Sequence, residues 1–139
     1  MLQSKFTEAI ASYNQAVAKE PTDSYYSKLS QVLTKQGNLD QAQQACQKVA
    51  KLGESYDTCS ITSLALYQQK GFPAVKAFYT QLAADIPPRK IAELYIKLGN
   101  EIFYNDGAKQ DAMAAFRQAL QVDPKNADAQ SALKSLLAN

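Results

Sequence analysis

Residues 92–129 read AELYIKLGNEIFYNDGAKQDAMAAFRQALQVDPKNADA, and this stretch decides the fold. Its second half places Ala112, Phe116 and Ala119 at steps of four and three residues, and Pro124 follows five residues later. Such steps put one small, one large and one small apolar residue on the same face of a helix, and a proline ends the helix. The stretch therefore predicts an amphipathic helix that stops before Pro124.

The same pattern occurs three more times along the chain. It starts again at Ala9, Ala42 and Val75, with a large or sulfur-containing residue four positions later. A proline closes the pattern in three of the four cases, at Pro21, Pro87 and Pro124. A pattern that returns at near-constant spacing indicates internal repeats.

Glycine, proline and asparagine turns separate segments in which apolar residues recur at three and four positions. This periodicity predicts an all-α chain of about eight helices, near residues 4–19, 23–36, 39–52, 56–70, 72–85, 89–105, 108–121 and 126–137. Connections this short make neighbouring helices antiparallel.

The helices that precede two of these patterns carry a matching pattern of their own. One reads Tyr95-x2-Leu98-Gly99-x2-Ile102, and the other reads Tyr26-x2-Leu29-Ser30-x2-Leu33. Together with the Ala-x3-aromatic and closing proline, they resemble the tetratricopeptide repeat (TPR). The resemblance implies one α-solenoid domain of stacked antiparallel helix hairpins over 1–139. Its parts are an orphan second helix (4–22), a repeat (23–55), a degenerate repeat (56–88), a repeat (89–125) and a C-terminal capping helix (126–139).

The register of the degenerate repeat has two solutions. Either Cys59, Thr62 and Leu66 take the core positions, or a slip of one residue puts Ser60, Ser63 and Tyr67 there. The slipped register would make Tyr67 and its neighbour Leu64 core residues rather than surface ones.

The resemblance also implies a concave groove, lined by the first helix of each pair, that holds a peptide or a helix of a partner protein. Its residues in this chain would be Ser27, Gln31, Thr34, Ser60, Leu64, Tyr67, Ile96, Lys97, Asn100 and Phe103. Some members of the family clamp acidic tails with paired Lys, Arg and Asn residues. Here only Asn100 with Lys97, and more distantly Lys28 and Lys35, could serve, so the full clamp is not present. We expect a non-catalytic scaffold or adaptor for protein–protein interaction in complex assembly.

The first helix suggests an alternative function. Its apolar face contains Phe6, Ile10, Tyr13 and Val17, and it looks like the second half of a pair whose first half is absent. An uncovered face of this size is unusual for a soluble monomer. We expect it to be covered by a homodimer partner or by the rest of a longer repeat protein, unless the next helix covers it.

Composition excludes several kinds of site. The chain has no histidine and only two cysteines, so we expect no catalytic residue, no metal site and no cofactor. Acidic residues such as Glu93, Glu101, Asp106 and Asp111 are explained more simply as surface and turn formers. A net charge of +2 with mixed signs argues against nucleic acid, and no apolar run is long enough for membrane insertion. We expect a soluble, cytoplasmic protein, although a removed leader or a membrane-anchored parent chain would leave no trace here.

The cysteines leave one question open. Cys46 takes the place of the repeat's aromatic residue, so we interpret it as a buried, reduced thiol that acts as a small hydrophobe. The alternative is a disulfide with Cys59, which lies early in the next helix.

Overall fold

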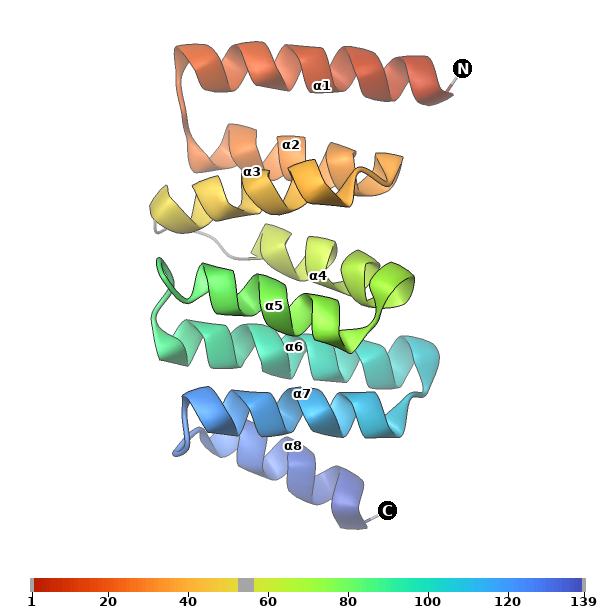
Figure 1. Cartoon of the computed structure of the whole chain (residues 1–139), viewed down its shortest axis with the longest axis vertical. Coiled ribbons are helices and arrows are strands. Elements are labelled where there is room, and N and C mark those ends of the chain that lie inside the picture. The colour runs from red at the N-terminus through yellow and green to blue at the C-terminus, as the bar shows by residue number, and fades with distance from the viewer. Residues whose placement is uncertain (1, 53–56, 139) are drawn as a thin grey trace. The chain divides into compact units, whose positions relative to one another are not determined.

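The computed structural model describes residues 2–52 and 57–138, and in this part of the chain it contains helices and no strand (Figure 1). The helices are α1 (Leu2–Lys19), α2 (Asp23–Gln36), α3 (Leu39–Leu52), α4 (Asp57–Lys70), α5 (Phe72–Leu82), α6 (Pro88–Asp106), α7 (Lys109–Val122) and α8 (Ala127–Ala138). The predicted all-α fold of about eight helices is confirmed.

One helix end was predicted wrongly. We expected the fifth helix to continue to residue 85, but α5 ends at Leu82. The Leu82 carbonyl accepts from the amides of both Asp85 and Ile86, which is a tight turn rather than a continued helix. Ile86 is buried at 2 % exposure, so burial of this side chain favours the turn over another helical step.

Residues at the helix ends explain where the best-defined helices begin and stop. Thr22 precedes α2 and its Oγ1 accepts from the Tyr25 amide, while Gly37 ends the helix at φ 91°. Pro88 opens α6 and Gly107 closes it at φ 63°. A proline fits the first helical turn, and a left-handed residue after the last turn favours glycine.

Contacts divide the chain into two compact units, Met1–Gly71 and Phe72–Asn139. Unit 1 contains α1 to α4, which run back and forth (Figure 1). Its core cluster consists of Leu29 and Leu33 from α2 with Ala42 and Ala45 from α3. Ile10 and Tyr13 of α1 pack against this cluster, so α1 is attached to unit 1 through part of its apolar face.

Unit 2 contains α5 to α8 and is centred on the pair α6 and α7. At Gly99 the two helices approach so closely that an added Cβ would lie 2.7 Å from Cε1 of Phe116. Tyr95 on the same helix meets Tyr79 of α5 edge-on, with ring centroids 4.7 Å apart. The Tyr79 and Phe116 side chains are both buried, at 0 % and 2 % exposure. A glycine and large aromatics therefore fill this core in a complementary way.

The degenerate repeat spans the boundary between the units, because α4 lies in unit 1 and α5 in unit 2. The division of 1–139 into one orphan helix, three repeats and a cap therefore remains a prediction. Cys59 and Thr62 of the first register and Ser60 and Ser63 of the second are all buried. Burial therefore separates the two registers only at their last position, where Leu66 is 1 % exposed and Tyr67 is half-buried.

Candidate partner-binding surfaces

The solvent-facing side of α6 carries the largest group of accessible side chains predicted for the groove. Ile96 is half-buried, Lys97 and Asn100 are exposed, and Phe103 is 39 % exposed. The buried residues Tyr95, Leu98 and Ile102 lie on the opposite side of the helix, as the helical period requires. We call Ile96, Lys97, Asn100, Phe103 and the adjacent Tyr104 the α6 strip.

Tyr104 was missed by the sequence reasoning. It is 82 % exposed, and its ring meets that of Phe103 edge-on at a centroid distance of 5.9 Å. Two consecutive aromatics at the end of an amphipathic helix are a signal that could have found it, since only one of them fits the apolar face. The pair forms an accessible aromatic edge at the C-terminal end of α6.

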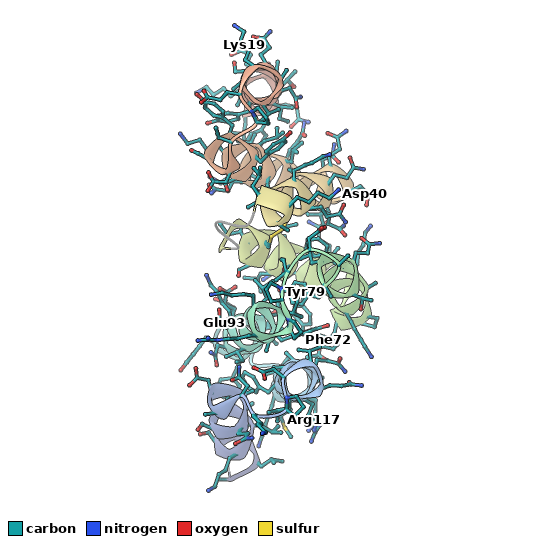
Figure 2. The ribbon with its side chains drawn as sticks, turned by 90° about the vertical axis from the view of Figure 1, so that its left-hand side faces the viewer. Lys19, Asp40, Phe72, Tyr79, Glu93 and Arg117 are labelled. Atoms are coloured by element: carbon teal, nitrogen blue, oxygen red, sulfur yellow. A yellow bond between two sulfur atoms is a disulfide. The ribbon has the colours of Figure 1, made fainter. Side chains whose placement is uncertain are left out.

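The charges along α6 largely neutralise one another. Glu93 lies 3.7 Å from Nε of Arg89 and 3.3 Å from Nζ of Lys90, and Figure 2 places it on the other side of unit 2 from Phe72. Burial raises the pKa of the Glu101 carboxyl, and the charge of Lys97 lowers it in part. A neutral strip with apolar ends suits a partner with an apolar face better than a strongly charged one.

The groove residues expected in unit 1 are less accessible. Ser27 and Gln31 are half-buried on α2, and Leu64 and Tyr67 are half-buried on α4. Ser60 is 4 % exposed, so in this structure it is a buried residue and not a surface one. Thr34 is engaged inside the protein, where its Oγ1 donates to the carbonyl of Ser30 at 2.8 Å.

Hydroxyl groups connect α2 to its neighbours in the interior of unit 1. The Ser30 Oγ donates to the Ala42 carbonyl of α3 at 3.2 Å, and it also lies 3.1 Å from the Thr62 Oγ1 of α4. Thr34 Oγ1 lies 3.1 Å from the same Thr62 oxygen. In each of these two contacts either hydroxyl oxygen could donate. We call Ser30, Thr34 and Thr62 the hydroxyl cluster.

A disulfide joins Cys46 of α3 to Cys59 of α4. The two Cα atoms are 5.5 Å apart, within the usual range for a disulfide, and both residues are 0 % exposed. Our interpretation of Cys46 as a reduced thiol is therefore wrong. Disulfides are rare in the reducing cytoplasm. The cytoplasmic location expected from the sequence stays a prediction.

A cavity of about 310 Å³ opens between α1, α2 and α3 in unit 1. Its apolar wall is formed by Leu29, Leu33 and Ala45, and its polar wall includes the Lys48 ammonium group and Gln44. The sequence reasoning missed it, because a gap between three helices depends on how they pack. The predicted self-association face lies beside it on α1, where Phe6, Ile10, Tyr13 and Val17 are all half-buried.

Comparison with known proteins identifies the repeats. A family model described as Tetratricopeptide repeat matches residues 23–55 and 92–126. The chain belongs to the tetratricopeptide repeat family. No curated protein matches it. The first match coincides with the repeat predicted at 23–55, and the second lies within three residues of the repeat predicted at 89–125. TPRs generally mediate protein–protein interaction and complex assembly, and the family is typically non-catalytic.

The two matched repeats fill the space between their paired helices with different residues. In the second, Gly99 leaves room for the ring of Phe116. In the first, Ser30 and Cys46 stand at the equivalent positions of the pattern. A serine side chain fills space that glycine leaves empty, and the smaller cysteine in place of the phenylalanine compensates for it. The first TPR therefore has a disulfide and hydroxyl groups where the second has an aromatic ring.

The described residues add no sign of other chemistry. Residues 2–52 and 57–138 contain no group of three His, Cys, Asp or Glu side chains placed to hold a metal ion. No helix among them combines the length and apolar character that crossing a membrane requires. Glu93, one of the carboxylates considered above, is held in ion pairs with Arg89 and Lys90.

Proposed function

We propose that this TPR protein is a non-catalytic scaffold or adaptor that binds a peptide or helix of a partner protein through the α6 strip. The observation that carries the proposal is the accessible aromatic edge of Phe103 and Tyr104 beside the exposed amide of Asn100. Aromatic residues are enriched at protein interfaces and often dominate their binding energy.

The composition of the α6 strip favours a partner segment with an apolar face. Ile96 and Phe103 lie about two helical turns apart, and Asn100 lies between them. A partner helix could place apolar side chains against both ends and pair a polar group with the amide in the middle. Leu64 and Tyr67 of α4, which the sequence also predicts to contact a partner, lie in unit 1 and are not part of the α6 strip.

Affinity capture followed by mass spectrometry tests the proposal. Wild type is compared with the double variant Phe103→Ala, Asn100→Ala, and partners that the variant loses are assigned to the α6 strip. A Leu137→Ala variant is the matched control, because Leu137 is 61 % exposed on α8 of the same unit and lies outside the strip. Truncating a hot-spot aromatic at the centre of an interface costs about 2 kcal/mol or more, which is roughly a thirtyfold loss of affinity.

The interpretation of the result is direct. Loss of the same partner from the double variant, with retention by Leu137→Ala, would support the α6 strip. Equal capture by all three proteins would exclude it as the partner-binding surface.

Self-association through α1 is a second candidate. It is supported by the fact that α1 has no fully buried residue although its apolar face contains Phe6, Ile10, Tyr13 and Val17. The contacts of Ile10 and Tyr13 with the unit 1 core count against it, because they already use part of that face. Concentration-dependent sedimentation of the full chain separates the two candidates.

A further inference from the structure

The way in which α4 is attached to unit 1 differs from the way the other helices pack. Among the α4 residues whose burial the structure describes, 59–70, the buried ones are Cys59, Ser60, Thr62, Ser63 and Leu66, so only one of these is a large aliphatic side chain. Its other large apolar residues remain accessible: Ile61 is 47 % exposed, and Leu64 and Tyr67 are half-buried. By comparison, α7 buries Met113, Phe116 and three alanines.

The polar residues buried on α4 add little attachment. The Ser63 Oγ donates to the Cys59 carbonyl of its own helix, so it makes no link to α2 or α3. The Ser60 Oγ is buried and has no hydrogen-bond partner among the described residues, which is unfavourable for the folded state. The buried Thr62 does reach another helix, because its Oγ1 lies 3.1 Å from the hydroxyl oxygens of Ser30 and Thr34 on α2.

The charged groups do not supply the missing attachment. An ion pair joins Lys70 of α4 to Asp40 of α3 at 3.9 Å, but the two side chains are 55 % and 82 % exposed. Solvent screening makes such a pair weak. The Cys46–Cys59 bond is therefore the strongest link between α3 and α4, and it lies in the fully buried part of their contact.

We propose that the Cys46–Cys59 disulfide holds α4 on unit 1 and that its reduction releases this helix. Reduction breaks the Sγ–Sγ bond: a dithiol gives up two electrons and two protons, each cysteine becomes a thiol, and the dithiol closes into its own disulfide. The protein is thus sensitive to the redox conditions around it. Release of α4 would also displace Leu64 and Tyr67, the two α4 residues predicted from the sequence to contact a partner.

Hydrogen exchange of the full chain, followed by mass spectrometry, tests this inference without a partner. Exchange is measured in the oxidised protein and after dithiothreitol, with thiol alkylation to confirm reduction. A bond that closes a loop of this size changes the opening equilibrium by roughly a hundredfold in the chain-entropy relation. We expect the amides of α4 to exchange faster by about that factor, while those of α6 and α7 serve as the internal reference.

The double variant Cys46→Ala, Cys59→Ala is the matched control. Its α4 amides should exchange at the fast rate with and without dithiothreitol. Because this variant has no disulfide, it tests the inference without requiring the reductant to reach the buried bond. Two outcomes would overturn the inference: equal protection of α4 in the oxidised and reduced chains, or two free thiols in denatured protein that has been equilibrated with oxidised glutathione. Neither outcome depends on whether the α6 strip binds a partner.

Discussion

Substituting Gly99 by alanine has two opposite effects on the stability of the protein: a gain in helix propensity and a steric contact with Phe116. Alanine favours a helix interior over glycine by about 1 kcal/mol, so helix propensity alone predicts a more stable protein. The new Cβ, however, would lie 2.7 Å from Cε1 of Phe116 and 3.0 Å from its Cδ1 and Cζ. Three ring atoms are too close at once, so a small rotation of the ring does not relieve the contact.

The packing around Phe116 determines how much the steric contact lowers the free energy of unfolding. Its ring is 2 % exposed, and Ala112, Ala115 and Ala119 of the same helix are fully buried, so the backbones are already close. Extra methyl groups in a well-packed core typically cost about 1–3 kcal/mol. Subtracting the propensity gain from the upper part of that range leaves a net loss of about 1–2 kcal/mol in the free energy of unfolding.

Urea denaturation followed by far-UV circular dichroism measures this difference, with the midpoint and slope fitted separately. The variant Phe116→Leu provides a rescue, because a smaller side chain makes room for the methyl group. Adding Gly99→Ala to Phe116→Leu should then cost less than adding it to the wild type. A higher midpoint for Gly99→Ala than for wild type would refute the reasoning, because propensity would then outweigh the steric contact.

Three further predictions concern other parts of the chain. Cys46→Phe should destabilise unit 1 by about 1–3 kcal/mol through overpacking, in addition to the loss of the Cys46–Cys59 disulfide. Adding Ser30→Gly should recover part of the overpacking loss in urea denaturation; no recovery would contradict the proposed equivalence of the two repeats. Burial raises the pKa of the Tyr95 phenol to about 12. The unfolded phenol ionises near its ordinary pKa of 10.0 whereas the folded one stays neutral, so stability should fall as pH rises from 10 to 12, by about 3 kcal/mol in total. Tyr95→Phe should remove that part of the pH dependence in alkaline denaturation. Tyr13→Glu should dissociate any oligomer seen by sedimentation, and an unchanged oligomer would exclude the α1 face.

The repeat pattern predicted the helices well because the spacing of apolar residues within each segment determines where a helix forms. The apolar periodicity, Gly37, Gly107 and Pro88 placed most helix ends within two residues. The end of α5 was missed because burial of Ile86, a tertiary effect, competes with continuing the helix.

The site was less predictable, for physical reasons that differ between residues. Asn100 and Phe103 were placed on an accessible face because helical spacing alone separates them from Tyr95 and Leu98. The burial of Ser60 follows from packing around α4, which the weak pattern of that helix does not encode. The disulfide was only the second choice, after a reduced thiol, because a cysteine at an aromatic position has the size and polarity of an ordinary core residue.

The packed tyrosines of unit 2 give the protein its own optical reporters. The chain has no tryptophan, so its near-ultraviolet signal comes from tyrosine, phenylalanine and the disulfide. Among the tyrosines whose burial the structure describes, Tyr79 and Tyr95 alone are fully buried, and their rings are fixed edge-on. Near-ultraviolet circular dichroism depends on such fixed packing. The tyrosine band therefore reports mainly on unit 2 and the disulfide absorption on unit 1, so the melting of the two halves can be followed in one unlabelled sample.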